Sequence, residues 1–386
     1  MKYYIIAGEA SGDLHGSGLI RELRRLDSTA SIRCWGGDKM QAAGGELVKH
    51  YRELAFMGFT EVLMNLRTIF RNLKFCKEDI LKHRPDVLVL IDYPGFNLRI
   101  AKWAHQQGMT VIYYISPQVW AWKEGRVRMM KECIDKMLVI LPFEKDYFRD
   151  KWNWDVEYVG HPLVEVIDTF RDSNLAIENL LTGKASESSE IIALLPGSRK
   201  QEIAKKLPVM LGVSAFFPGF QFIVAQAPAV EDEFYKGFTD QYPNVSIVQN
   251  KTYSLLLQSR AALVTSGTAT LETALFGVPE VVCYKGSAIS YQIAKRIVSI
   301  KYISLVNLIM DKLVVKEMIQ ERMTVENLKT ELKDLLMNDE RISELKKDYA
   351  ELKKLLSLGG NASANAACSI VDFLQKKGTH KVSPTI

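Results

Sequence analysis

Apolar runs and helical patterns alternate along the first part of the chain. Runs rich in Val, Ile, Leu and Tyr occupy residues 2–8, 31–37, 86–92, 110–116 and 136–142. The stretches between them repeat apolar residues at helical spacing, as residues 60–83 do. Strands that are apolar on both faces and alternate with helices are typical of a parallel sheet covered on both sides. The pattern predicts a first α/β domain at residues 1–165.

The same alternation restarts after a polar connection. Residues 173–189 end in TGKASESSE, which is typical of an exposed loop or a link between domains. The apolar runs that follow occupy residues 191–196, 220–226, 245–250, 261–267 and 280–285. We expect a second α/β domain of similar size at residues 166–340. A chain of 386 residues is too long for one ordinary core, which agrees with two domains.

From about residue 315 onward the pattern is helical only. Residues 326–338 and 341–356 are strongly amphipathic, which favours solvated helices with one packed face over a coiled coil. We expect residues 341–386 to form helices that cross back to the first domain or exchange with the partner in a homodimer. Residues 376–386 are expected to fray.

The predicted fold is therefore α/β, with two Rossmann-like doubly wound domains that face a cleft and a helical C-terminal segment. Open α/β sheets bind ligands beyond the carboxyl ends of their strands. The polar residues that directly follow the apolar runs are the candidate site residues.

Composition limits the classes of function. The chain is 47% hydrophobic and 25% charged, which is typical of a soluble globular enzyme. Its net charge of +5 suits anionic small molecules or a membrane surface and is too small to indicate nucleic-acid binding. There is no signal-peptide pattern and no run of roughly 20 apolar residues. Five scattered cysteines without CxxC spacing indicate reduced thiols, so we expect a cytoplasmic protein.

The motif AGEASGDLHG follows the first apolar run. Gly8, Gly12 and Gly16 recur at every fourth position, a spacing that matches neither GxGxxG nor a Walker A sequence. Small residues here would let the backbone approach a ligand, and Ser11 with Asp13 could cap the next helix. A purely structural turn between strand and helix explains the motif equally well.

Two motifs of the first domain carry chemistry-bearing side chains. Asp92 ends a fully apolar run, where burial would raise its pKa and suit it to act as a general base. A turn-forming role before Tyr-Pro-Gly is the alternative. Trp120 and Trp122 follow another run and could line a pocket for an apolar or sugar ring, or pack in the core.

Two motifs of the second domain are suited to an anion. In PGSRKQE, Ser198 and Arg199 precede a helical pattern, and a helix N-terminus offers free N–H groups and a favourable dipole. A capped helix with an exposed arginine is the alternative. In SGTATLE, Ser266 and Thr268 could bind a phosphate in the same way, and Glu272 could accept both hydroxyls of a ribose.

No metal or cofactor is expected. The sequence contains neither a DxD motif after a strand nor HExxH, and its six histidines do not cluster. A departing diphosphate would then be stabilised by Arg199 and by the two helix N-termini.

Taken together, nine runs resemble the lipid A disaccharide synthases, which are glycosyltransferases of the two-domain GT-B type. The runs occur in the family's order between residue 7 and about residue 310. They are AGEASGD, MGFTEVL, PDVLVLIDYPGFN, SPQVWAW, LPFEKDYF, VGHPL, LLPGSR, SGTATLE and YISLVNLI.

The resemblance implies a cytoplasmic enzyme that is peripherally associated with the inner membrane. It would join UDP-2,3-diacylglucosamine to 2,3-diacylglucosamine 1-phosphate, with inversion, to give a β(1→6) tetraacyl disaccharide 1-phosphate and UDP. Its partners would be the UDP-sugar donor, the acylated glucosamine phosphate acceptor and the membrane surface.

The resemblance also assigns roles to residues. Asp92 matches the family's general base, Arg199 its arginine near the donor diphosphate, Glu272 its residue on the nucleotide side, and Asn307 an asparagine of the site. The full set of expected substrate-binding residues is Gly8, Glu9, Ser11, Gly12, Ser198, Arg199, Glu202, Ser266, Gly267, Thr268, Ala269, Glu272 and Asn307.

This chain departs from the family at two positions of the IDYPGFN run. Gly95 stands where members often carry a second acid, which leaves Asp92 as the carboxylate of that turn. Tyr93 stands where a small residue is often found, and it would narrow the acceptor side.

Acylated substrates require contact with a bilayer. Residues 56–77 combine apolar and basic side chains, which suits an interfacial helix or an acyl-chain pocket. An ordinary helix packed on the first sheet is the alternative. The side chains concerned are Phe59, Met64, Ile69, Phe70, Phe75, Arg67, Arg71, Lys74 and Lys77.

Other functions fit the same fold. An enzyme like UDP-N-acetylglucosamine 2-epimerase would share the nucleotide site but would need no bilayer. A non-catalytic UDP-sugar binding protein would not need Asp92. An NAD-dependent oxidoreductase is disfavoured because no GxGxxG follows a strand.

Overall fold

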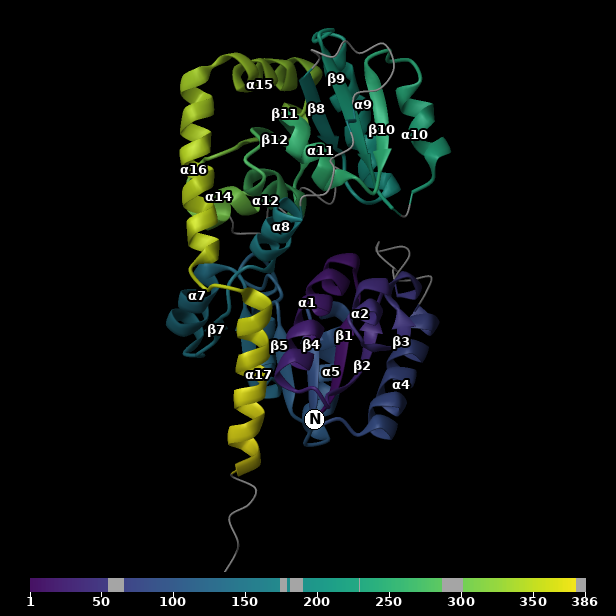
Figure 1. Cartoon of the computed structure of the whole chain (residues 1–386), viewed down its shortest axis with the longest axis vertical. Helices are drawn as coiled ribbons and strands as arrows, with labels where there is room; N and C mark the ends of the chain where they lie inside the picture. Colours follow the sequence, from purple (N-terminus) through teal and green to yellow (C-terminus); the bar gives the residue numbers. More distant parts are fainter. Residues whose placement is uncertain (55–65, 174–178, 181–189, 229, 287–300, 380–386) are drawn as a thin grey trace, which may run out of the picture. The chain divides into compact units, whose positions relative to one another are not determined.

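The computed structural model divides into two compact units. The first comprises Met1–Pro162 and Leu356–Ile386, and the second comprises Leu163–Leu355. The residues that the structure describes are 1–54, 66–173, 179–180, 190–228, 230–286 and 301–379. Each unit contains one parallel sheet, and Figure 1 shows helices on both faces of each.

The first unit is built on a seven-stranded sheet in the order β3-β2-β1-β4-β5-β6-β7. All neighbouring strands pair in parallel. The central strands are buried on both faces, which explains their unbroken apolar sequences. The strands are β1 (Lys2–Ala7), β2 (Ser31–Gly36), β3 (Glu46–His50), β4 (Val87–Ile91), β5 (Val111–Tyr114), β6 (Lys136–Val139) and β7 (Glu157–Tyr158).

Alternate strand residues meet different helices. Tyr4, Ile6 and Leu90 belong to one core cluster, which also contains Cys76 and Ile80 of helix α4. Helix α1 packs against α17, the last helix of the chain. The helices of this unit are α1 (Ala10–Leu26), α2 (Asp38–Ala42), α4 (Leu66–His83), α5 (Pro94–Gln106), α6 (Val127–Cys133), α7 (Pro142–Trp152) and α17 (Ala362–Thr379), with 3-10 turns η1 (Tyr51–Glu53) and η2 (Glu124–Arg126).

The second unit repeats the architecture with a six-stranded sheet in the order β10-β9-β8-β11-β12-β13. Its strands are β8 (Glu190–Leu195), β9 (Phe220–Gln226), β10 (Val245–Gln249), β11 (Ser259–Thr265), β12 (Glu280–Tyr284) and β13 (Lys316–Ile319). Its helices are α8 (Pro162–Asp172), α9 (Lys200–Ser214), α10 (Asp232–Thr239), α11 (Thr252–Gln258), α12 (Thr268–Leu275), α14 (Leu305–Met310), α15 (Val325–Met337) and α16 (Asp339–Ser357), with the 3-10 turn η3 (Gln320–Arg322). Two doubly wound sheets with a helical C-terminal segment confirm the predicted fold class.

The expectation of helices alone after residue 315 is wrong. Lys316–Ile319 forms β13, which pairs in parallel with β12 at the edge of the second sheet. This strand, KEMI, has only 4 residues, of which only Met318 is buried, so it carries no apolar run that could reveal it. The short edge strands β3 and β7 escaped the sequence pattern for the same reason.

The C-terminal helices serve different units. Helix α16 belongs to the second unit through Leu355, whereas α17 packs on α1 of the same chain. Gly18 permits that contact, because a Cβ there would lie 2.5 Å from the hydroxyl of Ser363. Residues 376–379, expected to fray, still belong to α17, and residues 380–386 lie outside the described residues.

In each sheet the order in which successive strands are added reverses direction at one point. In the first unit this switch point lies between β1 and β4, and in the second it lies between β8 and β11. Ligands of open α/β sheets bind beyond the carboxyl ends of the strands at such points. We therefore expect the ligand-binding residues to follow Ala7, Ile91, Leu195 and Thr265.

Candidate active site

Asp92 and Gly8 lie together at the switch point of the first unit. Ala7 pairs with Ile91, so the residues that follow them leave the sheet side by side. The ring of Tyr93 fills the space beside Gly8, where a Cβ would lie 2.2 Å from a ring carbon. The residue at position 8 must therefore be glycine, because any side chain there would collide with the ring of Tyr93.

The main chain at Asp92 is held in an uncommon conformation. Asp92 and Tyr93 both have positive φ, of 43° and 49°, which for non-glycine residues stores strain. The amide of Asn97 and the hydroxyl of Tyr113 donate hydrogen bonds to the main-chain oxygen of Asp92, at 2.8 and 2.6 Å. The N–H of Asp92 donates to the main-chain oxygen of Tyr114 at 3.1 Å. These bonds fix the main chain from which the carboxyl group extends.

The surroundings of Asp92 favour its protonated form. Burial, and then the negative charge of Glu9, raise the pKa of Asp92 to about 7 from the usual 3.8, against an opposing hydrogen bond from the N–H of Tyr93. Burial also raises the pKa of Glu144 to about 8, with a smaller contribution from Asp92. A carboxyl group with a pKa near neutrality can accept a proton and later release it, as a general base must.

The glycine-rich motif is packed against protein rather than open space. A Cβ at Gly12 would lie 3.0 Å from the Cβ of Ala7, and one at Gly16 would lie 2.7 Å from the sulfur of Met40. Glu9 is the N-cap residue of α1, although its side chain makes no capping hydrogen bond. Ser11 is half-buried in the first turn of this helix. These contacts position α1 closely on the carboxyl ends of β1 and β4.

Asp13 does not cap α1, which corrects the sequence interpretation. It lies inside that helix, is buried, and accepts hydrogen bonds from the N–H groups of Gly37, Lys39 and Met40 at 2.7, 3.2 and 3.0 Å. Asp13 therefore caps α2, which the sequence motif alone could not reveal because the two helices are joined through β2.

Tyr93 and Gly95, which depart from the family pattern, have different surroundings. Tyr93 donates a hydrogen bond from its hydroxyl to the main-chain oxygen of Leu54 at 3.1 Å and stacks near Phe96. No atom of the described residues lies within 4 Å of a Cβ built at Gly95. Tyr93 is consequently part of the wall beside Asp92, whereas Gly95 leaves room.

Trp120 and Trp122 have different environments. The indole N–H of Trp120 donates to the carboxylate of Glu144 at 3.2 Å, and that carboxylate also accepts the N–H of Leu141 at 3.0 Å. Trp122 is 45% exposed, with the ammonium of Lys123 3.9 Å from the centre of its ring. Sequence reasoning missed Glu144, although an acid three residues into LPFEKDYF is the signal of a helix cap.

The LLPGSR motif turns sharply at the end of β8. Gly197 has a φ of 122°, a conformation that favours glycine. Ser198 and Arg199 are exposed, and Arg199 is the N-cap residue of α9. The guanidinium of Arg199 lies 3.3 Å from the carboxylate of Glu202, which lies 4.0 Å from the ammonium of Lys206.

The SGTATLE motif occupies the neighbouring strand end. Gly267 has a φ of 146°, and a Cβ there would meet no atom within 4 Å among the described residues. Thr268 is exposed at the start of α12, and Ala269 after it is half-buried. The hydroxyl of Ser266 donates to the main-chain oxygen of Ile303 at 2.9 Å. Exposed residues at the start of a helix are where an anion can bind.

Glu272 lies one turn into α12 and is engaged by a tyrosine. The hydroxyl of Tyr253 donates to one of its carboxylate oxygens at 2.9 Å. Burial raises the pKa of Glu272, and this hydrogen bond opposes the rise. Sequence reasoning missed Tyr253, which lies in an unremarkable run on α11 and reaches Glu272 only through the tertiary fold.

Asn307 is fully buried and its amide is saturated by protein groups. It accepts the N–H groups of Val314 and Val315 and donates to the main-chain oxygen of Val315 and to Glu317, all between 2.8 and 2.9 Å. Glu317 in turn accepts the N–H of Ile303, whose oxygen receives Ser266. Asn307 thus positions the loop beside Ser266.

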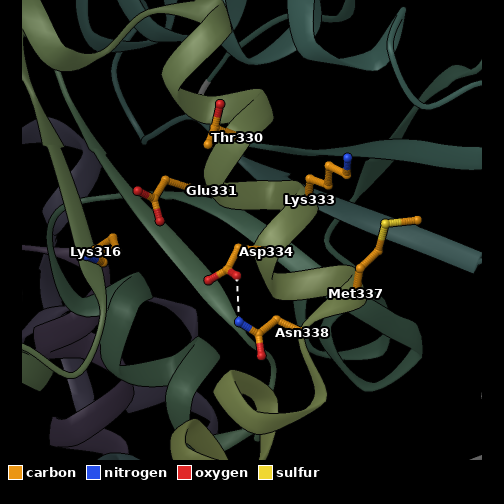
Figure 2. A pocket seen from close by; sticks show the side chains of 7 residues that line it. All are labelled: Lys316, Thr330, Glu331, Lys333, Asp334, Met337 and Asn338. Carbon is orange, nitrogen blue, oxygen red and sulfur yellow. Dashed lines mark hydrogen bonds between the residues drawn. The ribbon is translucent and has the colours of Figure 1, made fainter.

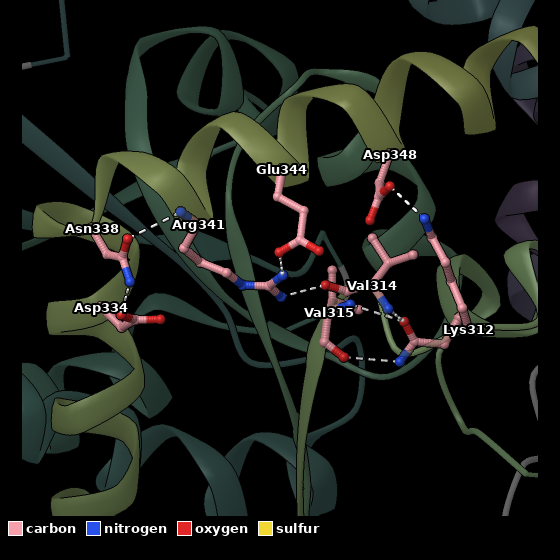
Figure 3. A network of polar contacts seen from close by, with 9 residues as sticks. Lys312, Val314, Val315, Asp334, Asn338, Arg341, Glu344 and Asp348 are labelled. Atoms are coloured by element: carbon pink, nitrogen blue, oxygen red, sulfur yellow. Dashed lines mark hydrogen bonds and ion pairs between the residues drawn. The ribbon is translucent and has the colours of Figure 1, made fainter.

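The same loop is held from helices α15 and α16 (Figure 3). Arg341 donates to the main-chain oxygen of Val314 at 2.5 Å, and Lys312 donates to Asp348 at 2.6 Å. Asn338 bonds both Asp334 and the N–H of Arg341. The contacts form a continuous chain from the C-terminal helices to the SGTATLE strand end.

A separate cavity of about 410 Å³ lies on α15 and β13 (Figure 2). It contains none of the site residues predicted from the sequence. Its lining is mixed polar and aliphatic, with Lys316, Thr330, Glu331, Lys333, Asp334, Met337 and Asn338. The described residues contain no group of three or more His, Cys, Asp or Glu side chains placed to hold a metal ion.

Comparison with known proteins identifies the family. A family model described as lipid-A-disaccharide synthetase matches residues 3–371. The chain belongs to the lipid A disaccharide synthase family. A lipid-A-disaccharide synthase of Syntrophus aciditrophicus is 38% identical over 383 residues, which cover 96% of this chain and 97% of that protein. One of Geobacter metallireducens is 37% identical over 378 residues, with 97% of each chain covered.

Solved structures show the fold shared with this family. A UDP-GlcNAc 2-epimerase from Neisseria meningitidis, solved with UDP-GlcNAc, superposes with a TM-score of 0.65 at 13% identity and covers 97% of this chain and 100% of its own. The calicheamicin glycosyltransferase CalG4 superposes with a TM-score of 0.60 at 15% identity, with 99% of each chain covered. The family predicted from the nine sequence runs is confirmed.

We expect Asp92→Asn to stabilise the folded protein at alkaline pH. A buried carboxyl whose pKa is about 7 in the fold and 3.8 when unfolded weakens the fold as pH rises between these values. An uncharged amide removes that cost. Thermal unfolding should show a melting temperature a few degrees above wild type at pH 8, and the difference should shrink toward pH 4.5. A lower melting temperature for the variant at both pH values would contradict the proposed environment of Asp92.

Proposed function

We propose that this protein is the glycosyltransferase that joins UDP-2,3-diacylglucosamine to 2,3-diacylglucosamine 1-phosphate. The products are the β(1→6) tetraacyl disaccharide 1-phosphate and UDP. Family membership over nearly the whole chain supports the reaction. The single structural observation that carries the catalytic assignment is the strained, half-buried Asp92 with a pKa raised to about 7.

In this mechanism Asp92 accepts the proton of the acceptor 6-hydroxyl. The freed oxygen attacks the anomeric carbon of the donor, and the bond from that carbon to the diphosphate oxygen breaks as the new bond forms. A single displacement inverts the configuration. The fixed main chain at Asp92 would help to keep its carboxylate near the acceptor hydroxyl. Holding a reacting group in place raises its effective concentration and can therefore increase the rate greatly.

The second unit is proposed to hold the UDP group of the donor. Glu272 would bind the ribose hydroxyls through the oxygen that Tyr253 does not occupy. The diphosphate would lie at the N-termini of α9 and α12, near Ser198, Arg199 and Thr268. Negative charge grows on the diphosphate as it leaves, and preoriented donors at such a place commonly contribute about 100- to 1,000-fold to the rate.

The epimerase reading is not favoured. The family matched over residues 3–371 is that of the synthases, whereas the solved structures named as UDP-N-acetylglucosamine 2-epimerases share only 12–14% sequence identity and therefore only the fold. A non-catalytic UDP-sugar binding protein would have no use for a carboxyl group held in strained backbone. The strain at Asp92 therefore favours catalysis.

The direct test is release of UDP from UDP-2,3-diacylglucosamine by purified protein in detergent micelles. Release should depend on 2,3-diacylglucosamine 1-phosphate. In Asp92→Asn it should fall at least about 1,000-fold, because the loss of one catalytic group that works together with others removes most of the rate enhancement.

Asp155→Asn, at an exposed aspartate, is the matched control and should retain wild-type activity. Release without acceptor, or full activity in Asp92→Asn, would show that the assignment of the base is wrong. No release by a folded protein that binds UDP would point to a different acceptor.

We further propose that the enzyme is cytoplasmic and binds the inner membrane peripherally through α4. No helix in the described residues has the length and apolarity to cross a bilayer. Leu73, Cys76 and Ile80 pack α4 on the sheet, as the structural alternative requires. Its other face is basic and apolar, with Phe70 64% and Phe75 42% exposed.

The remaining residues of this predicted surface divide into two groups. Arg67, Arg71 and Lys74 are exposed, whereas Ile69 and Lys77 are half-buried. Phe59 and Met64 lie outside the described residues. The predicted homodimer stays a prediction.

Membrane binding is tested by sedimentation with vesicles of phosphatidylethanolamine and phosphatidylglycerol. The triple variant Arg67→Gln, Phe70→Ser, Arg71→Gln should bind at least about fivefold more weakly than wild type, because each basic residue near an anionic surface contributes roughly 1 kcal/mol. Met337→Ser, at an apolar residue 73% exposed on α15, is the control and should bind normally. Equal binding by the triple variant and wild type would exclude this face of α4.

A further inference from the structure

Lys206 is a cation buried at the switch point of the second unit. It lies on α9 and only 3% of its surface is exposed, although lysine is among the residues least often buried. Ile203, Leu207 and Met210 on the same helix are buried, so Lys206 interrupts an apolar stripe. A charge in that position calls for a partner of opposite charge.

The ammonium of Lys206 lies between the two strand ends at which the donor is proposed to bind. It donates a hydrogen bond to the hydroxyl of Thr265, the last residue of β11. On the other side, a Cβ built at Gly197 would lie 3.4 Å from its nitrogen. Strands β8 and β11 are neighbours, so this one side chain lies beside the Gly197 turn and bonds the residue that precedes SGTATLE.

Lys206 and Arg199 share an acidic neighbour. Glu202 lies 3.3 Å from Arg199 and 4.0 Å from Lys206, so one carboxylate serves two cations. Burial lowers the pKa of Lys206, and Arg199 lowers it further, while Glu202 and Cys283 oppose the shift. An anion beside Gly197 would oppose the effect of burial and favour the ammonium form of Lys206.

We propose that Lys206 is a positioning residue for the diphosphate of the nucleotide, acting from beneath the Gly197 turn on the loops of both strand ends. The inference rests on the proposed function, because it presupposes that UDP binds at this edge. Lys206 supplies a fixed positive charge in a site of low polarity and holds Thr265, and through it the turn that begins at Ser266. Arg199 would complement it from the exposed side.

Calorimetric titration of UDP and of uridine separates this role from a merely structural one. Lys206→Met keeps the length of the side chain and removes the charge. It should weaken UDP binding by about 10- to 100-fold and leave uridine binding unchanged, because only UDP carries the diphosphate. Lys205→Met, at the exposed neighbouring lysine, is the control and should match wild type for both ligands.

The outcomes are distinguishable. If Lys206→Met leaves the ratio of UDP affinity to uridine affinity unchanged, the proposed role of Lys206 is wrong, whether both affinities persist or both fall. Binding of UDP by the wild-type protein would still support the donor site in that case. Failure of the wild-type protein to bind UDP would overturn both proposals. If Lys206→Met does not fold, Lys206→Gln, whose amide can still bond Thr265, provides the neutral variant, and the same loss of preference for UDP is expected.

Discussion

Two hydrogen bonds to the main-chain oxygen of Asp92 hold the turn that carries the proposed general base of the first unit. Tyr113 and Asn97 donate them, and they keep two successive residues in the left-handed region. Without these bonds the turn would relax, since each such residue costs of order 1–3 kcal/mol. The orientation of the carboxyl group, the contact of Tyr93 with Gly8, and the burial that raises the pKa of Asp92 all depend on this arrangement.

The proposed anion-binding edge of the second unit is held by a different set of contacts. A chain of hydrogen bonds runs from Arg341 on α16 through Val314 and Asn307 to Glu317, and from there through Ile303 to Ser266. This chain of bonds ties the loop that ends at Ile303 to the SGTATLE turn. The C-terminal helices would therefore support the proposed donor site through this chain of contacts.

The fold class could be predicted from the sequence because the central strands of both sheets are buried on two faces and so form apolar runs. Val87–Ile91 and Ile191–Leu195 are examples. Edge strands such as Lys316–Ile319 were missed because half-exposed strands of 4 residues leave no apolar run. Asp92, Arg199 and the SGTATLE turn could be found from sequence because they directly follow apolar strands.

Partners that come from distant segments could not be found in this way. Tyr253 reaches Glu272, and Asp13 reaches α2, only after the chain has folded. Lys206 did leave a signal, a lysine within an apolar helical stripe, which is rare enough to indicate a paired or functional charge. Asn307 could be matched to a site residue from the sequence, but the four hydrogen bonds that occupy its amide could not be predicted in this way.

The central claim is that Asp92 is a general base whose proton affinity is set by burial and by Glu9. The pH dependence of kcat/KM for acceptor-dependent UDP release, measured from about pH 5 to about pH 9 for wild type and Glu9→Gln, tests it most directly. In wild type the rate should rise with pH through a midpoint of about 7. Glu9→Gln removes a repelling charge, so the midpoint should move to lower pH. A rate independent of pH over this range, or a midpoint that Glu9→Gln leaves in place, would contradict the account.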